Sequence, residues 1–355
     1  MLGTFVQHVP DMSLPTVHII SQLRSAFGGT EQRSMRLYAM LRQTTAAYLW
    51  NTHPNPELAR EFCPDARRLH ARRLSFPQSG IFMFVGNFDW HVGRWLALTR
   101  PQRMIVLLNT PDTHLALPFL RRLHGFKPSV PIDVCYASRW MRDQIGVPGE
   151  VFDSPIDVEL FKPDGRGGEA GARPFTVGRL SRDTPVKHHP SDPALYRRLA
   201  QEGFRVRLMG ATVLAPELNG VDGIELLPEG AEPAPEFLRS IDCFYYRTRP
   251  DWVEPSGRVI CEAMATALPL ICVPPGGFTE LVEHGVNAFI SADEHEVFET
   301  LLALRNDRAR SREIGARARA EVERRFGELA MRRQIEYMAS TQVVQDVRSV
   351  LGTAG

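Results

Sequence analysis

Short apolar runs rich in branched residues alternate along the chain with longer stretches that carry apolar residues at three- and four-residue steps, and this alternation constrains the fold more than any other feature. Runs of four to eight residues suit buried strands, whereas the longer spacing suits one face of a helix. Alternating strands and helices predict βαβ units and therefore an α/β fold with parallel sheets. In the first half we predict strands near 17–21, 46–50, 81–85, 104–108, 132–136 and 151–153, and helices over 31–41, 92–98, 113–123 and 139–144.

A polar, glycine-rich segment at 161–171 interrupts this rhythm, and a new strand is predicted at 174–177. Such a segment is typical of a linker between domains. The 355 residues suffice for two cores of ordinary size. We therefore predict one domain over 1–172 and a second over 173–330. The second has further predicted strands near 206–209, 224–227, 241–246, 270–273 and 288–290, and helical segments from 294 to about 340.

The composition excludes several classes of protein. Hydrophobic residues make up 43% of the chain and charged residues 23%, so neither a disordered nor a fibrous protein is expected. The five cysteines are scattered, mostly within apolar runs, and lack the spacing of zinc ligands, which predicts reduced core residues and no metal site. The sequence shows neither a signal peptide nor the roughly 20 apolar residues that span a bilayer. We expect a cytoplasmic protein.

The formal net charge of +1 provides no general attraction to nucleic acid. Positive charge is nevertheless concentrated in the first half of the chain. We favour solvated helix faces as its explanation, and the alternative is peripheral contact with the inner face of a membrane. The residues concerned are Arg67, Arg68, Arg72, Arg73, Arg121 and Arg122.

The segment from Glu254 to Glu262 follows a predicted strand and has the pattern of a loop that enters a helix. Ser256 and Gly257 can begin that helix, and its first backbone N–H groups would stabilise a diphosphate. Glu254 would lie in the loop, while Glu262, about a turn and a half into the helix, could accept hydrogen bonds from ribose hydroxyls. The spacing therefore allows one carboxylate at each end of a nucleotide-sugar.

These residues resemble the motif of two glutamates separated by seven residues in retaining glycosyltransferases of family 4. The resemblance implies the GT-B fold, in which two Rossmann-like domains face a central cleft. It covers nearly the whole chain and is strongest over 177–289. One departure is Ala267, where the family usually has glycine before its Leu-Pro pair. The neighbouring matches are residues 177–182, Lys187, Gly276, Gly277 and Glu280.

The resemblance also implies roles for individual residues. Arg179 and Lys187 would bind the donor diphosphate and compensate its charge without a metal. Lys187 comes about two residues later than the family pattern expects, so Arg182 is the alternative. Glu254 would contact the sugar and Glu262 the ribose. Ser256, Gly257 and Arg258 complete the implied donor-binding set.

In the first half, Gly28 and Gly29 lie between a predicted strand and a predicted helix, which resembles the first glycine-rich loop of the family. Small residues there let backbone N–H groups approach a phosphate. For the residue that orients the acceptor, the sequence offers three alternatives. Asn109 and His114 follow one predicted strand, and His91 follows the preceding strand.

These expectations together describe a retaining glycosyltransferase that requires no cofactor and uses a UDP- or GDP-sugar as donor. The acceptor is expected to be a glycan, a lipid-linked glycan or a small molecule, and the resemblance implies a role in surface polysaccharide synthesis. The tail, 331–355, is expected to return to the first domain through a helix near 327–345. The alternative function is a catalytically inactive GT-B scaffold or nucleotide-sugar-binding partner subunit.

Overall fold

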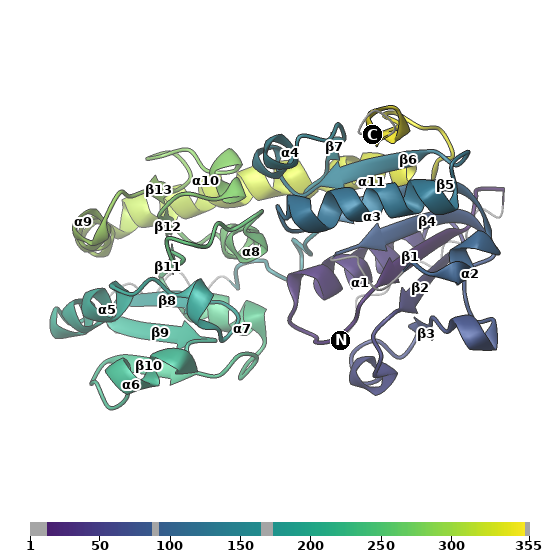
Figure 1. Cartoon of the computed structure of the whole chain (residues 1–355). Coiled ribbons are helices and arrows are strands. Elements are labelled where there is room, and N and C mark those ends of the chain that lie inside the picture. Colours follow the sequence, from purple (N-terminus) through teal and green to yellow (C-terminus); the bar gives the residue numbers. More distant parts are fainter. Residues whose placement is uncertain (1–12, 87–91, 165–172, 352–355) are drawn as a thin grey trace. The chain divides into compact units, whose positions relative to one another are not determined.

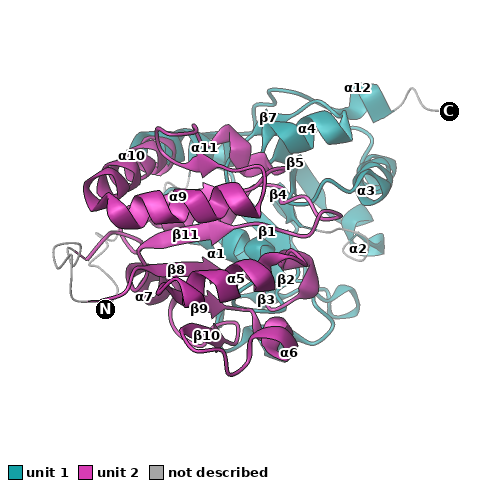
Figure 2. Cartoon of the chain, turned by 90° about the vertical axis from the view of Figure 1, so that its left-hand side faces the viewer, with its two compact units in different colours: residues 1–155, 328–355 teal, residues 156–327 magenta. Residues whose placement is uncertain are grey.

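The computed structural model describes residues 13–86, 92–164 and 173–351, which form two compact units. Unit 1 comprises residues 1–155 and 328–355, and unit 2 comprises residues 156–327 (Figure 2). The first division therefore comes before the glycine-rich segment and not at 172. The reason is that Arg239 of unit 2 donates hydrogen bonds to the carbonyl oxygens of Leu160 and Lys162, which ties this stretch to the second unit.

Unit 1 contains a seven-stranded parallel sheet with the strand order β3-β2-β1-β4-β5-β6-β7 (Figure 1). Helices cover both faces, so the central strands are buried and mostly apolar, with a few buried polar residues such as His18, Arg103 and Asp133. The strands are β1 (Val17–Ser21), β2 (Ala47–Asn51), β3 (Arg67–Arg68), β4 (Ser79–Val85), β5 (Arg100–Leu108), β6 (Ile132–Tyr136) and β7 (Glu150–Val151). The helices are α1 (Gly29–Leu41), α2 (Arg94–Ala97), α3 (Thr113–Phe126), α4 (Arg139–Ile145), α11 (Glu328–Ala339) and α12 (Arg348–Leu351).

Unit 2 repeats this design with six parallel strands in the order β10-β9-β8-β11-β12-β13. The strands are β8 (Thr176–Leu180), β9 (Arg205–Met209), β10 (Ile224–Leu227), β11 (Cys243–Tyr246), β12 (Leu270–Cys272) and β13 (Phe289–Ile290). The helices are α5 (Asp192–Gln201), α6 (Ala215–Leu218), α7 (Ala234–Arg239), α8 (Arg258–Ala265), α9 (Glu294–Asn306) and α10 (Arg308–Phe326). The predicted α/β class with parallel sheets is confirmed.

The expectation that the arginines of the first half lie on helix faces is wrong for most of them. Arg67 and Arg68 form the edge strand β3, which pairs with Trp50 and Asn51 of β2. Arg72 and Arg73 lie in the 3₁₀ turn Ala71–Arg73, and only Arg121 and Arg122 belong to a helix, α3. A two-residue edge strand is too short to show a period in the sequence, which explains the error.

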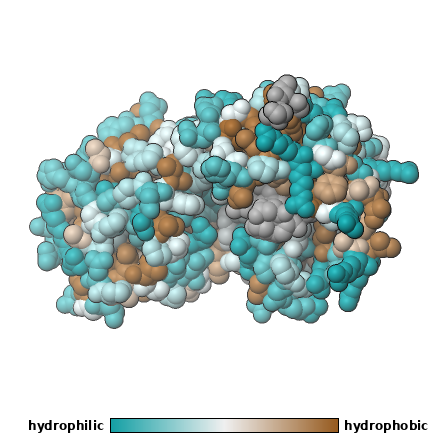
Figure 3. All heavy atoms as spheres, viewed as in Figure 1, coloured by the Kyte–Doolittle hydropathy of each residue, from teal (hydrophilic) through white to brown (hydrophobic). Residues whose placement is uncertain are grey.

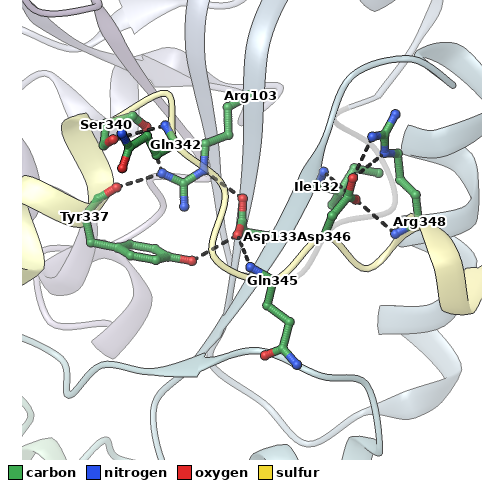
Figure 4. A network of polar contacts seen from close by, with 9 residues as sticks. All are labelled: Arg103, Ile132, Asp133, Tyr337, Ser340, Gln342, Gln345, Asp346 and Arg348. Carbon is green, nitrogen blue, oxygen red and sulfur yellow. Dashed lines mark hydrogen bonds and ion pairs between the residues drawn. The ribbon is translucent and has the colours of Figure 1, made fainter.

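The C-terminal segment is anchored to unit 1 by a buried polar network (Figure 4). Arg103 of β5 forms an ion pair with Asp133 of β6 at 2.7 Å and donates to the carbonyl oxygens of Tyr337 and Ser340. The hydroxyl of Tyr337 donates to Asp133. These contacts lie around the last turn of α11, which ends at Ala339, so the helix expected to reach about 345 ends earlier.

After α11 the chain continues to α12, whose Leu351 packs in the same core as α3. The side chain of Asp346 accepts hydrogen bonds from the backbone N–H groups of Ile132 and Arg348, and its carboxylate pairs with the Arg348 guanidinium. The segment from 328 onward thus contributes to the cores on both faces of the sheet, since Ile335 and Met338 of α11 lie in the other cluster. It is an integral part of unit 1.

On the face seen in Figure 3, hydrophobic residues lie singly or in small groups among hydrophilic ones. Within the described ranges, no helix is long and apolar enough to cross a membrane. All five cysteines are buried and free, as predicted for reduced core residues.

Candidate functional site

The sequence-predicted donor residues of unit 2 gather at the carboxyl edge of its sheet, where the strand order reverses between β8 and β11. Connections from two such strands leave in opposite directions, and ligands of parallel sheets bind in the space that opens there. Arg179 is the fourth residue of β8, and Glu254 lies in the loop that follows β11. The fold therefore brings together residues that are 75 positions apart.

Arg179 is fully buried, yet it lacks an ion-pair partner among the residues that the structure describes. Its guanidinium lies 4.7 Å from the centre of the Tyr246 ring and donates one hydrogen bond, from Nη2 to the carbonyl oxygen of Lys187. The other two nitrogens, Nε and Nη1, make no hydrogen bond within the described ranges. Burial disfavours the charge, but the neighbouring Tyr196, Tyr246 and Asp192 outweigh burial, so the pKa of Arg179 is raised. A buried cation in this state is suited to receive an anion.

Lys187 ends the 3₁₀ turn Pro185–Lys187 and is almost fully buried. Its ammonium pairs with Glu254 at 2.5 Å and lies 5.1 Å from the centre of the Trp252 ring. By contrast, Arg182, the alternative to Lys187, is exposed. The structure therefore places Lys187 beside Glu254 despite its later position in the chain.

Glu254 is held in the ionised state. Burial opposes its charge, but the Lys187 ammonium and the hydrogen bond from the Tyr246 hydroxyl at 2.7 Å outweigh burial, so the pKa of the carboxyl lies below its ordinary value. The backbone of Glu254 is also fixed, because its carbonyl oxygen accepts a hydrogen bond from the Gly277 N–H at 2.8 Å. This contact joins the two loops in which the sequence motifs lie.

Helix α8 begins at Arg258, and Gly257 precedes it in a left-handed conformation with φ of 70°. A Cβ atom on Gly257 would lie 2.9 Å from the Cβ of Phe278, so only glycine fits without strain. No side chain caps the first turn of α8, and Ser256 lies in the preceding loop.

On α8 itself, Arg258 and Glu262 form an ion pair one turn apart, at 2.9 Å. Burial raises the pKa of the Glu262 carboxyl, and the Arg258 guanidinium opposes that rise. The carboxylate is therefore positioned by its neighbour while remaining close to the loop that carries Glu254.

Ala267, the departure from the family pattern, also has a positive φ, of 58°. Its carbonyl oxygen lies so close to Gly315 of α10 that a Cβ atom there would be 2.0 Å away. The left-handed turn after α8 therefore exists in this chain without the glycine that would favour it.

The glycine-rich loop of unit 1 precedes α1, with Gly28 at the N-cap position and in an extended conformation. A Cβ atom on Gly28 would meet the Glu31 carboxylate, whereas one on Gly29 would meet nothing within 4 Å. Local packing therefore requires glycine at neither position, because the Glu31 carboxylate is the end of a flexible side chain.

Asn109 follows β5 at the carboxyl edge of the unit 1 sheet. Its Oδ1 accepts a hydrogen bond of 2.6 Å from the fully buried Arg33 of α1, and its Nδ2 donates to the Thr30 hydroxyl. Arg33 also donates to the carbonyl oxygen of Phe152, just after β7. The amide of Asn109 is therefore held in one orientation.

His114 lies exposed in the first turn of α3, and the structure gives it no hydrogen bond within the described residues. His91, the other candidate, is outside the described residues. Of the three candidates for orienting an acceptor, Asn109 is the one with defined surroundings.

Three polar side chains at these sheet edges were not predicted: Arg33, Asp192 and Tyr246. Asp192 is completely buried at the start of α5, accepts a hydrogen bond from Tyr245, and has its pKa raised to about 6 by burial. The sequence offered one signal for Tyr246, its position as the last residue of an apolar strand. It offered none for Arg33, whose partners are 76 and 119 residues away.

Across the described parts of the chain, no group of three or more histidine, cysteine, aspartate or glutamate residues is placed to hold a metal ion.

Residues 175–307 match the model of the family described as "Glycosyl transferases group 1". No curated protein sequence matches the chain. The solved structures of similar fold share little sequence, so they report on the fold.

HepE from Anabaena, solved in complex with UDP and glucose, has 17% identity and a TM-score of 0.70 over 92% of this chain and 100% of its own. Sucrose-phosphate synthase from Thermosynechococcus elongatus has 14% identity and a TM-score of 0.70 over 91% and 98%. A glycosyltransferase from Rickettsia africae has 11% identity and a TM-score of 0.68 over 93% and 100%. Residues 175–307 are therefore similar to the Glycosyl transferases group 1 family, and the chain has the GT-B fold of these solved glycosyltransferase structures.

Proposed function

We propose that this protein is a retaining glycosyltransferase that uses a nucleotide-diphosphate sugar and needs no metal. The observation that carries the proposal is the buried guanidinium of Arg179, which has no carboxylate partner among the described residues and lies at the carboxyl edge beside Lys187 and Glu254. A diphosphate would pair directly with this guanidinium.

The donor diphosphate binds to Arg179, Lys187 and the uncapped first turn of α8 in this proposal. Because Lys187 is already paired with Glu254, the phosphate competes with that carboxylate for the ammonium. Glu254 is then able to accept a hydrogen bond from a hydroxyl of the sugar. The two cations stabilise the negative charge that develops on the departing nucleotide.

Glu262 accepts hydrogen bonds from the ribose hydroxyls, with Arg258 holding its carboxylate in place. In unit 1, Gly28 and Gly29 offer backbone N–H groups to a phosphate, with Gly28 at the N-cap of α1. The nucleotide is UDP or GDP. UDP is the first choice, because HepE was solved with UDP and with UDP-glucose.

The acceptor is a glycan, a lipid-linked glycan or a small molecule, oriented by Asn109, whose amide is fixed by Arg33. His114 is the alternative. Attack on the face from which the nucleotide leaves would retain the anomeric configuration, with the donor phosphate accepting the acceptor proton. The five buried thiols suit a reducing compartment, so we place the reaction in the cytoplasm, in surface polysaccharide synthesis at the inner face of a membrane.

The test is the thermal stability of the full chain with UDP, GDP and ADP and with their sugars, in the presence of EDTA. Ligand at about 100 times its Kd stabilises a native protein by about 2.7 kcal/mol, which is a measurable rise in Tm. We expect a rise with one nucleotide that is lost in Glu262→Ala. The control is Glu299→Ala, which removes an exposed carboxylate of α9 in the same unit.

A rise that appears only when a divalent metal replaces EDTA would overturn metal independence. If no nucleotide raises the Tm, or if Glu262→Ala leaves the rise unchanged, the assignment of this donor site is wrong. Enzymatic turnover of the bound nucleotide-sugar, with the product anomer identified by NMR, would then decide whether configuration is retained.

A further inference from the structure

Residues 67–74, which we call the basic loop, form a closed turn at the edge of the unit 1 sheet. His70 and Ser75 pair through two backbone hydrogen bonds of 2.8 and 3.2 Å, and the Ser75 hydroxyl donates to the carbonyl oxygen of Arg68 at 2.8 Å. The His70 ring accepts a hydrogen bond from the Arg73 N–H. The loop therefore has a defined shape that its own backbone maintains.

The tip of the basic loop is apolar and strained. Leu74 is 70% exposed, more than any other large hydrophobic side chain in the described residues. Its backbone is left-handed, with φ of 53° and ψ of 28°, a conformation that a leucine rarely adopts. The fold thus holds a large apolar side chain in water at a position where glycine or asparagine would be easier to accommodate.

The arginines of the basic loop lack ion-pair partners within the described ranges. Arg67, Arg68, Arg72 and Arg73 are all exposed, and the Arg67 guanidinium lies 3.7 Å from the centre of the Tyr48 ring.

The neighbouring segment differs from the basic loop in this respect. There, Arg42 pairs with Asp65 and Arg60 pairs with Glu57. The nearest acid in sequence without an ion pair is Glu61. The basic loop therefore carries four exposed cations as well as the exposed Leu74, and within the described residues no acid pairs with them.

We propose that the basic loop docks unit 1 on a membrane surface that contains anionic lipid. Guanidinium groups bind lipid phosphates, and Leu74 enters the boundary between headgroups and acyl chains. A loop that exposes both a leucine and four arginines matches a surface that is anionic outside and apolar beneath. A nucleic acid would use the cations but not the leucine. This inference identifies the residues that would make the membrane contact included in the proposed function. It does not depend on the donor site.

The test is sedimentation of the full chain with two kinds of vesicle, one of phosphatidylcholine alone and one of phosphatidylcholine mixed with phosphatidylglycerol. We expect binding to the anionic vesicles, weakened by added salt. Arg72→Glu combined with Arg73→Glu should lower the partition coefficient by roughly 30-fold or more. Leu74→Ser should lower it by about tenfold.

The matched control is Arg121→Glu combined with Arg312→Glu, which reverses two exposed charges on α3 and α10. We expect it to change the partition coefficient by less than about twofold, since it leaves the basic loop intact. If the glutamate variant of the loop unfolds, Arg72→Gln combined with Arg73→Gln replaces it.

Three outcomes would overturn the proposal: equal binding to both kinds of vesicle, binding that the control weakens as much as the loop variants do, or no binding at all. Sedimentation needs no donor or acceptor, so its failure would leave the donor assignment intact. A further measurement adds single-stranded RNA to the vesicle mixture. If RNA displaces the protein from the vesicles, and does so equally well for Leu74→Ser, the partner of the basic loop is nucleic acid.

Discussion

Arg103 of unit 1 and Arg179 of unit 2 are both buried arginines, and the two have opposite surroundings. Arg103 of unit 1 is paired with Asp133 at 2.7 Å and donates to two backbone carbonyl oxygens of the C-terminal segment (Figure 4). Arg179 of unit 2 donates to one carbonyl oxygen, and the described residues provide it with no carboxylate within ion-pair distance. Both side chains are completely buried.

The difference separates a structural charge from one that is suited to binding. A buried cation with its partner in the same chain contributes to a closed network, and such a network holds the fold in one arrangement. A buried cation without that partner has a large desolvation cost that an incoming anion can offset. The comparison therefore predicts that removing the two charges will have different consequences.

The largest effect is expected from breaking the closed network. Asp133→Asn leaves Arg103 buried and uncompensated, and we expect a loss of about 3–5 kcal/mol in the free energy of unfolding. Arg103→Met combined with Asp133→Leu should recover most of that loss, because both buried charges are then absent. Urea denaturation measures each variant.

The control for this comparison is Arg42→Met, which removes one partner of the exposed Arg42–Asp65 pair and should cost less than about 1 kcal/mol. If Asp133→Asn costs no more than Arg42→Met, the interpretation of Arg103 as a structural charge is wrong.

The next effect concerns buried histidines, one in each unit. Burial lowers the pKa of His18 in unit 1 and of His188 in unit 2 to about 4. The unfolded chain therefore binds protons that the folded chain excludes, and stability falls as the pH decreases from about 6.5 to about 4, by up to about 3 kcal/mol for each group.

His18→Gln and His188→Gln should each flatten the pH dependence of stability over this window. Asp192 acts in the opposite direction, because burial raises its pKa to about 6 and the folded state takes up its proton first. Asp192→Asn should therefore steepen the loss of stability on acidification. Unfolding in urea at about pH 7 and about pH 4 tests both expectations, and parallel pH profiles for all four proteins would contradict them.

The smallest effect on stability, and the most specific one on binding, is expected at Arg179. Arg179→Met keeps an apolar side chain beside Tyr246 and removes a charge without a carboxylate partner, so stability should change by less than about 1 kcal/mol. Affinity for the nucleotide should fall by about 2 kcal/mol, or roughly 30-fold. Arg179→Lys should restore part of that affinity.

Calorimetric titration with UDP or GDP, alongside urea denaturation, measures both quantities. A variant that binds nucleotide normally but loses as much stability as Asp133→Asn would show that Arg179 is as structural as Arg103, and the contrast between the units would disappear.

Local sequence determined most of the sheet strands and much of the set of candidate residues. Strands β1 and β6 have the predicted bounds. A parallel strand buried on both faces is a mostly apolar run, so its ends can be recognised in the sequence. Positions 254, 257 and 262 were recognisable for a similar reason, since a loop entering a helix leaves its pattern in consecutive residues. The roles of these residues remain predictions.

Tertiary structure alone decided which buried polar groups meet. Arg103 contacts the carbonyl oxygen of Ser340 across 237 residues, and Arg33 contacts Asn109 across 76. No sequence pattern connects such positions. The spacing of apolar residues predicts which face of a helix or strand is buried, but it does not predict which distant residue packs against that face. The partner of a buried charge is set by how distant elements pack, and that packing also determined that Arg103 has a carboxylate beside it while Arg179 has none within the described residues.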